Sequence, residues 1–182
     1  RIDVTELMAF RKKINNDLGV KYSLNDYVLK ATAKALKNNK HILVSLDGDQ
    51  IIKRAHVNIG MAVALEDGLI VPVIKDADKM SLGEISEAAR DLAERARTNK
   101  LSMDEYKGST FSISNLGMFG VETFNPIINQ PDAGILGVCA VQDELVMDDA
   151  GAITKRQFMR ISFTFDHRLI DGATAAKFEL AI

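Results

Sequence analysis

Cysteine is nearly absent from this chain, since Cys139 is the only one among 182 residues. A single thiol excludes a disulfide within the chain and is typical of a reducing compartment. Cys139 lies in the apolar run of residues 134–141, which has the pattern of a buried strand. We therefore expect a core thiol at this position, because a reactive cysteine needs a partly exposed, electropositive setting.

A marked excess of either charge is also missing. The net charge of −2 offers no electrostatic reason to expect nucleic acid or an anionic membrane surface as a partner. No apolar run approaches the ~20 residues that a membrane-spanning helix needs. The hydrophobic content of 47% is enough for a substantial core, so the composition predicts one ordinary globular domain over residues 1–182.

Helix-start signals occur at several places in the sequence. Asp3 with Glu6 and Ser81 with Glu84 have capping-box spacing, and Ser23 precedes an apolar helical face. The helices expected from these signals and from the helical spacing of apolar residues end at Gly19, after Leu36 and near Thr98, and a last helix covers residues 172–182.

Apolar runs between turn residues predict strands over residues 42–46, 50–53, 57–65, 69–74, 110–114, 135–141 and 158–165. The first two strands flank a hairpin turn at residues 47–49, and residues 148–151 predict another turn. Pro72 lacks an N–H group, so its strand is expected at a sheet edge or a bulge. This order favours an α/β protein in which helices pack on one face of a large mixed sheet.

The most informative stretch is residues 165–172, in which His167 follows a predicted strand and Asp171 stands four residues further on. Histidine is the natural proton carrier near neutral pH, and the end of a strand would hold it for general-base catalysis. The spacing alone is weak evidence. His167 can equally be a satisfied interior histidine, and Asp171 can be the N-cap of the last helix.

Longer motifs resemble one family, the catalytic domains of the dihydrolipoamide acyltransferases, which are the core subunits of 2-oxoacid dehydrogenase complexes. The similarity covers essentially the whole chain, and its motifs are residues 68–78, 111–120, 126–131, 135–138 and 162–178. It implies a two-layer α/β sandwich like that of chloramphenicol acetyltransferase. The segments 114–120 and 126–131 look most like the acetyl-transferring branch, which serves pyruvate or acetoin dehydrogenase complexes.

The resemblance implies acyl exchange between two thiols, those of the dihydrolipoyl group and of coenzyme A. It makes His167 the base that takes the thiol proton and Ser114 the hydroxyl donor to the tetrahedral oxyanion. Taken alone, Ser114 is more simply a turn-capping serine, because it ends a strand before a glycine-rich loop. We assign Asp171 to fixing the histidine loop, through an arginine such as Arg168.

The same resemblance places coenzyme A contacts at Arg11, Ser23 and Asn115. Arg11 would donate to a phosphate, although a solvated helix charge is the simpler reading of that residue. Some relatives have polar coenzyme contacts at two further positions, where this chain has Ala64 and Ala93. Only backbone or apolar contact is expected there. The charged residues around 90–100 alternate in sign along a helix and indicate a solvated face.

Partners and cofactors also follow from the resemblance. Members of the family form homotrimers with the active site between protomers, which assemble into a cubic or icosahedral core of twenty-four or sixty subunits. The core binds decarboxylase and dihydrolipoamide dehydrogenase components. Both ends of the chain look cut, so we expect lipoyl and subunit-binding domains upstream. The location implied is the bacterial cytoplasm or, in a eukaryote, the mitochondrial matrix.

Two other readings remain open. One is a free-standing coenzyme-A-dependent O-acetyltransferase that uses the same histidine motif. The other is an inactive structural core of a multienzyme complex, which would have no need of His167, Ser114 and Asp171. No metal is expected, because the three histidines are scattered and lack the spacing of metal ligands.

Overall fold

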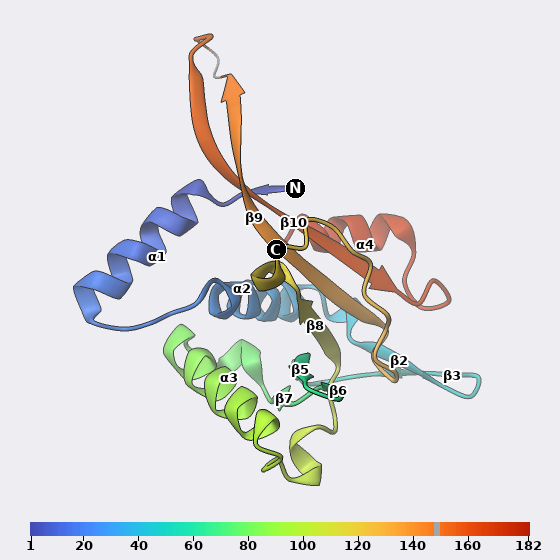
Figure 1. Ribbon diagram of the computed structural model, residues 1–182. Helices are drawn as coiled ribbons and strands as arrows, with labels where there is room; N and C mark the ends of the chain where they lie inside the picture. The colour runs from blue at the N-terminus through green and yellow to red at the C-terminus, as the bar shows by residue number, and fades with distance from the viewer. Residues whose placement is uncertain (148–149) are drawn as a thin grey trace.

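A mixed β-sheet organises the computed structural model, which describes residues 1–147 and 150–182 (Figure 1). Within the described residues its six strands lie in the order β1-β10-β9-β8-β4-β7. They are β1 (Ile2–Asp3), β4 (Ile59–Met61), β7 (Val73–Ile74), β8 (Phe111–Asn115), β9 (Gly134–Met147) and β10 (Ile153–Phe165). Strand β8 is parallel to both β4 and β9, whereas the other neighbours are antiparallel. The predicted large mixed sheet is confirmed.

The predicted strands 57–65 and 69–74 each divide in two. Their outer parts, β4 and β7, pair in the main sheet, and their inner parts form a separate hairpin of β5 (Val63–Leu65) and β6 (Gly68–Ile70). The division falls at Ala62, whose N–H donates to the Ile113 carbonyl, and at Pro72, which has no N–H to donate. β7 is an edge strand, as Pro72 predicted.

The hairpin predicted around residues 47–49 is confirmed as β2 (Val44–Asp47) and β3 (Gln50–Lys53). A second hairpin, β9–β10, is much longer than predicted and projects beyond the body of the molecule (Figure 1). The sequence signal missed its outer half because those residues are largely polar and are not part of the core. Of the turn predicted at residues 148–151, residues 148–149 lie outside the described part of the chain.

The four α-helices of the described residues are α1 (Thr5–Leu18), α2 (Leu24–Asn38), α3 (Leu82–Arg97) and α4 (Gly172–Glu179). Ser23 and Ser81 cap α2 and α3, as predicted, and both do so through capping boxes, although only that of Ser81 was predicted. Gly19 ends α1 in the left-handed conformation, with φ of 64°. None of these helices is long and apolar enough to cross a membrane.

The predicted Asp3 cap is wrong. The N-cap of α1 is Val4, because Asp3 pairs with Phe158 in the sheet and its backbone is extended. The Asp3 carboxylate still accepts hydrogen bonds from the Thr5 N–H at 3.0 Å and from the Thr5 hydroxyl at 2.6 Å. These bonds lower the pKa of Asp3. The sheet pairing moved the helix start one residue beyond the expected cap.

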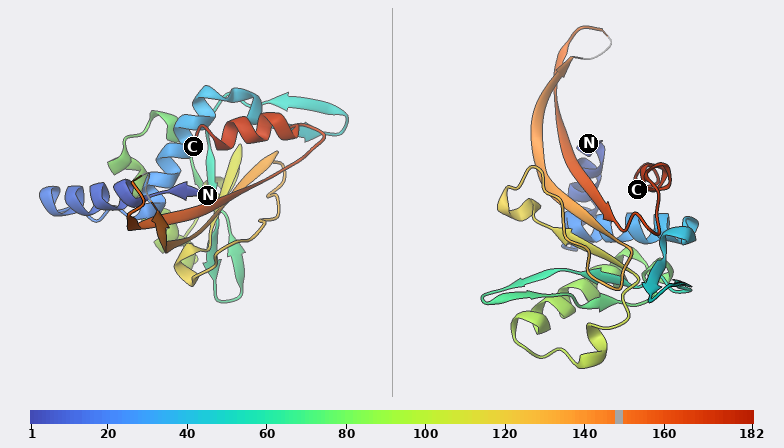
Figure 2. Two further views of the ribbon diagram at one scale, coloured as in Figure 1. Left: turned by 90° about the horizontal axis from the view of Figure 1, so that it is seen from above. Right: turned by 90° about the vertical axis from the view of Figure 1, so that its right-hand side faces the viewer.

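Helices α2 and α4 lie on one side of the β9–β10 hairpin, and the segment after β8 lies on the other (Figure 2, right). An aromatic cluster of Phe111, Phe163 and Phe178 joins β8, β10 and α4, with ring centroids 5.2–5.7 Å apart. Cys139 is buried at 3% exposure, which confirms the expected core thiol. Burial raises the pKa of this thiol.

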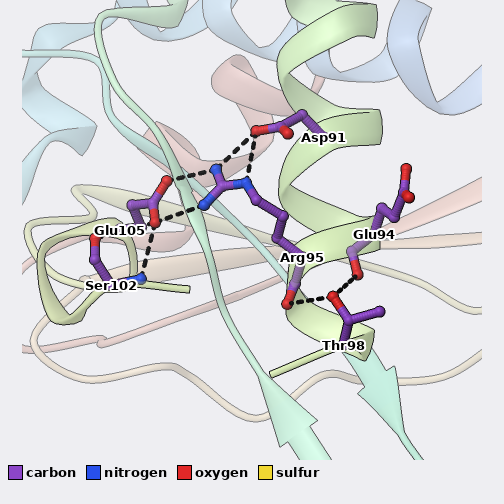
Figure 3. Close-up of polar contacts among 6 residues, drawn as sticks. All are labelled: Asp91, Glu94, Arg95, Thr98, Ser102 and Glu105. Atoms are coloured by element: carbon purple, nitrogen blue, oxygen red, sulfur yellow. Dashed lines mark hydrogen bonds and ion pairs between the residues drawn. The ribbon is translucent and has the colours of Figure 1, made fainter. Parts of the chain in front are cut away.

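The C-terminal half of α3 is tied to the 3₁₀ turn Met103–Glu105 by Arg95 (Figure 3). The Arg95 guanidinium donates to Asp91 on its own helix at 2.9 Å and to Glu105 at 2.7 Å. Glu105 also accepts from the Ser102 N–H, and these bonds, that of Arg95 first, lower the pKa of Glu105 to about 2. This end of α3 is therefore held in place by a charged network.

Candidate active site

His167 lies at the surface in a turn directly after β10. The turn is anchored through its backbone, because the Asp166 N–H donates to the Ala133 carbonyl at 2.8 Å. The Ile170 N–H closes the turn by donating to the Asp166 carbonyl at 3.0 Å, and the Ile170 side chain is buried. The His167 ring lies beside that of Phe165, with centroids 5.6 Å apart. The imidazole is thus exposed on a well-held backbone, as a proton carrier requires.

Arg168 does not bind Asp171, so that part of the sequence interpretation is wrong. Its guanidinium pairs with the Asp166 carboxylate, Nε to Oδ1 at 2.9 Å and a terminal nitrogen to Oδ2 at 2.6 Å. The Asp166 carboxylate also accepts the Arg168 N–H at 3.0 Å. The bonds from Arg168 lower the pKa of Asp166. Because Asp166 and Arg168 are only two residues apart, their ion pair stabilises the histidine turn.

Asp171 is the N-cap of α4, the structural role that its position predicted. Its carboxylate accepts from the Thr174 N–H at 2.9 Å and from the Thr174 hydroxyl at 2.7 Å, and these bonds lower its pKa. Asp171 therefore fixes the boundary between the histidine turn and α4. It does so through Thr174 rather than through an arginine.

Ser114, near the end of β8, lines a cavity of about 440 Å³ that α2, α3, β5 and β8 enclose. Two of the three residues expected at the coenzyme, Ser23 and Asn115, line the same cavity. So do Ala64 and Ala93, the two positions expected to offer only apolar or backbone contact. The volume is in the range of small-molecule sites.

Arg11, the third residue expected at the coenzyme, is not among those lining this cavity. Its Nε donates to the Tyr22 carbonyl at 2.8 Å, and it lines a separate, open hollow between α1 and Gln157. The guanidinium is thus engaged in holding α1 against the segment that leads into α2. Asn15 reinforces this by exchanging two hydrogen bonds with the Tyr22 backbone.

Three cations that the sequence analysis did not assign to the site line the cavity: Lys21, Arg90 and Arg97. The charges of residues 90–100 were expected to form a solvated face, and two of these side chains also line the cavity. Arg90 and Arg97 are exposed, yet they lie three residues before and four residues after Ala93 on the same face of α3. Helical spacing from Ala93 was the signal that could have found them.

The polar wall beside Ser114 is built from amides. The Asn115 Nδ2 donates to the Asn25 Oδ1 at 2.9 Å, and the Asn115 Oδ1 accepts the Gly117 N–H at 2.9 Å. Gly117 must be small, because a Cβ there would lie 2.6 Å from the Cys139 carbonyl oxygen. This network ties the end of β8 both to α2 and to its own following turn.

Within one chain, Ser114 and His167 lie apart. Ser114 is level with Gly137 of β9, which is level with Ser162 of β10. β10 continues from Ser162 to Phe165, about 10 Å further along the strand. His167 follows beyond that end, whereas Ser114 lies two strands away and near the other end of β8. One copy of the chain does not place the imidazole beside the serine.

The fold places the chain in a structural class that is broader than any one family. The architecture is similar to that of chloramphenicol acetyltransferase, with a TM-score of 0.60 over 94% of this chain and 80% of that one. At 14% identity this similarity shows the fold alone, and it confirms the predicted sandwich class. The chain belongs to the family described as 2-oxoacid dehydrogenases acyltransferase (catalytic domain), whose model matches residues 1–182.

Curated relatives in this family transfer different acyl groups. The chain is 44% identical, over 97% of its length, to the dihydrolipoyllysine-residue acetyltransferase component of the pyruvate dehydrogenase complex of Cupriavidus necator. It is 40% identical, over its full length, to the succinyltransferase component of the 2-oxoglutarate dehydrogenase complex of Rickettsia bellii. It spans 32% and 46% of these proteins, respectively, so it corresponds to only part of them.

Solved structures of related proteins share this fold. Azotobacter vinelandii dihydrolipoamide acetyltransferase matches with a TM-score of 0.90 and 41% identity, covering 98% of this chain and 76% of that one. That structure belongs to an investigation of a serine, a histidine and an asparagine in its catalytic mechanism. The cubic core of a pyruvate dehydrogenase multienzyme complex matches with a TM-score of 0.91 and 40% identity, covering 98% and 75%.

Proposed function

We propose that the chain transfers an acetyl group between dihydrolipoamide and coenzyme A, as the core component of a pyruvate or acetoin dehydrogenase complex. The observation that carries this proposal is a cavity whose lining combines Ser114 and Asn115 with three cationic side chains, those of Lys21, Arg90 and Arg97. Together with an exposed, anchored histidine on the same chain, it supplies the parts of a thiol acyltransferase. Membership of the family gives these parts their roles.

Coenzyme A fits the chemistry of the cavity. Lys21, Arg90 and Arg97 would pair with the phosphates of the nucleotide, because guanidinium and ammonium groups are the usual phosphate donors. The apolar wall, which includes Ala64 and Ala93, would take the pantetheine arm. The arm would then present its sulfur near Ser114. Ser23, which also lines the cavity, is available for a further polar contact.

In the proposed reaction, His167 takes the proton of the attacking thiol. A thiol with a pKa near 8.5 is mostly protonated at neutral pH, so a base at this step raises the rate. The sulfur adds to the thioester carbonyl, and the Ser114 hydroxyl donates to the resulting oxyanion. The intermediate then expels the second sulfur, which recovers the proton from the imidazolium. One carbon–sulfur bond forms and one breaks.

The distance between Ser114 and His167 within one chain supports a site shared by two copies. In the proposed homotrimer, His167 of one protomer meets Ser114 of the next. Such trimers would assemble into a larger core that binds the decarboxylase and dihydrolipoamide dehydrogenase components. The similarity to the cubic core structure supports this assembly. The expected location is the bacterial cytoplasm, or the mitochondrial matrix in a eukaryote.

The test is a panel of acyl-coenzyme A substrates assayed against dihydrolipoamide, with protein of known oligomeric state. We expect acetyl-CoA to have the highest kcat/KM. Preference for succinyl-CoA would move the chain to the succinyl branch, which the relatives represent at similar identity. An assembled protein without turnover on any acyl-CoA would support the inactive-core reading, and acetylation of a small alcohol the O-acetyltransferase reading.

A further inference from the structure

Asp132 is a buried carboxylate that takes no part in the proposed reaction. Asp132 is 3% exposed, between β8 and the start of β9. It accepts hydrogen bonds from the hydroxyls of Ser112 at 2.6 Å and of Ser109 at 2.9 Å. The Asn129 Nδ2 adds a bond to the Ser112 hydroxyl at 3.2 Å. Burying a carboxylate costs free energy unless it is well hydrogen-bonded, so these hydrogen bonds are a specific part of the fold.

The Asp132 carboxylate reaches the strand that carries the proposed oxyanion donor. Ser112 is fully buried on β8 and lies two residues before Ser114. Side chains two residues apart on a strand point to the same face of the sheet. The bond from Ser112 therefore ties Asp132 to the strand and face from which Ser114 projects.

The backbone next to Asp132 reaches the histidine turn. Ala133, the following residue, is 1% exposed, and its carbonyl accepts the Asp166 N–H at 2.8 Å. This bond holds the start of the turn that presents His167. The next residue, Gly134, is level with Phe165 at the end of β10. The position of the imidazole thus depends on where the segment 132–134 is held.

We propose that Asp132 is a positioning residue for acyl transfer, which locks the segment 132–134 onto β8 and so fixes both the histidine turn and the strand bearing Ser114. This inference rests on the proposed function. Asp132 touches neither substrate nor reacting atoms and acts through its hydrogen bonds from Ser112 and Ser109 and through the Ala133 carbonyl. Because each copy contributes its serine and its histidine to different sites, one Asp132 would align parts of two sites.

The main test variant is Asp132→Asn, which keeps the size of the side chain but offers one acceptor oxygen to two serine donors. We expect kcat to fall roughly tenfold or more, because a small misplacement of a catalytic group is enough for such a loss. The KM for acetyl-CoA should stay within about twofold, since Asp132 does not line the coenzyme cavity. Asp17→Asn, an exposed aspartate of α1, is the matched control and should leave both constants unchanged.

Hydrogen exchange gives a second readout that needs no turnover. In Asp132→Asn, the amides of residues 166–170 should exchange faster, while those of α3 keep their wild-type rates. Ser112→Ala, which breaks only the β8 side of the anchor, should reproduce both effects and serves as the deciding variant if Asp132→Asn does not assemble. Wild-type kcat with unchanged exchange in residues 166–170, or a change confined to KM, would overturn the inference. If the wild-type protein turns over no acyl-CoA, the proposed function fails, and exchange alone decides whether Asp132 holds the turn.

Discussion

His167 differs from an ordinary surface histidine in how its backbone is held. The ring is exposed, but the turn beneath it is bonded to Ala133, closed on Asp166 and anchored by the buried Ile170. Asp171 caps the helix that follows. At the scale of single residues, the proposed base is therefore an exposed side chain on a firmly held backbone.

His167→Ala is expected to lower turnover by roughly 10²–10⁴-fold, the usual contribution of a general base. Assembly should be intact, because the side chain is exposed and the turn is held by its backbone. The measurement is steady-state acyl transfer together with analytical ultracentrifugation. His56→Ala, which removes an exposed histidine paired with Asp76, is the control. Near-wild-type turnover of His167→Ala would remove this residue from the mechanism.

Ser114→Ala is expected to lower kcat by ~10²–10³-fold if its hydroxyl is the sole oxyanion donor. The loss should appear in kcat rather than in KM, because the oxyanion exists only in the transition state and the intermediate. Steady-state kinetics with acetyl-CoA measure the split. An unchanged kcat would assign the oxyanion to a backbone amide instead.

The titration of Asp132 should make the free energy of unfolding depend on pH. Burial raises its pKa to about 6, against the hydrogen bonds from Ser112 and Ser109 and the nearby Arg54, all of which lower it. The folded protein thus holds this proton more tightly than the unfolded chain. Its contribution to stability is present in full below the ordinary value of 3.8 and is lost as pH rises through about 6.

Between about pH 4 and pH 7, the wild-type protein should therefore lose roughly 2.4 kcal/mol of unfolding free energy relative to Asp132→Asn. Urea denaturation at a series of pH values and constant protomer concentration measures the difference. Parallel pH curves for the two proteins would show that Asp132 has an ordinary pKa.

At the scale of elements, α3 presents two arginines to the cavity and uses a third to hold itself in place. Arg90 and Arg97 share a face with Ala93, whereas Arg95 is bound to Asp91 and Glu105. The helix can thus keep its cationic face toward the cavity rim. This division of roles follows from helical spacing, since residues two apart lie on different faces.

Arg97→Glu is expected to raise the KM for acetyl-CoA roughly tenfold, because it replaces a phosphate partner with a repelling charge. The kcat should change little, since Arg97 is at the rim and not at the reacting atoms. Lys13→Glu on α1, an exposed lysine outside the cavity lining, is the charge-matched control. Equal KM values for Arg97→Glu and the control would place the phosphates elsewhere.

At the scale of the whole molecule, the sheet register separates Ser114 from His167, so the proposed reaction needs more than one copy of the chain. The β9–β10 hairpin, with Leu145, Met147 and Ile153 exposed at 72–75%, also projects from the body (Figure 1). Both features are those expected of a protomer in the assembly proposed above.

Co-assembly of His167→Ala with Ser114→Ala should restore activity. In trimers of equal mixture, about a quarter of the shared sites combine an intact histidine from one copy with an intact serine from the next. Turnover near that fraction of the wild-type value, after co-expression, is the expected result. Separately assembled variants that are mixed afterwards serve as the control. Activity no higher than that of either variant alone would place each site within a single chain.

Sequence patterns predicted the features that depend on neighbours only a few residues away. Ser23 and Ser81 cap their helices, Gly19 ends α1, and Pro72 directly precedes the edge strand β7, because each effect acts within one turn or one strand pair. Asp3 failed as a cap because pairing with a distant strand competed for its backbone. Arg168 was assigned the wrong partner because Asp166, two residues before it, lies within closer reach.

Local patterning and motif similarity were thus enough to identify the fold class and the family, and they carry the prediction that His167 is the base. The arrangement of the site came from contacts between residues far apart in the chain. Asn25 meets Asn115 across 90 positions, and Arg90 meets the cavity only because α3 packs with that face toward it. Strand register placed Ser114 and His167 two strands apart and at different levels along the sheet. Register and helix facing are set by the packing of the whole core, and no short stretch of residues encodes them.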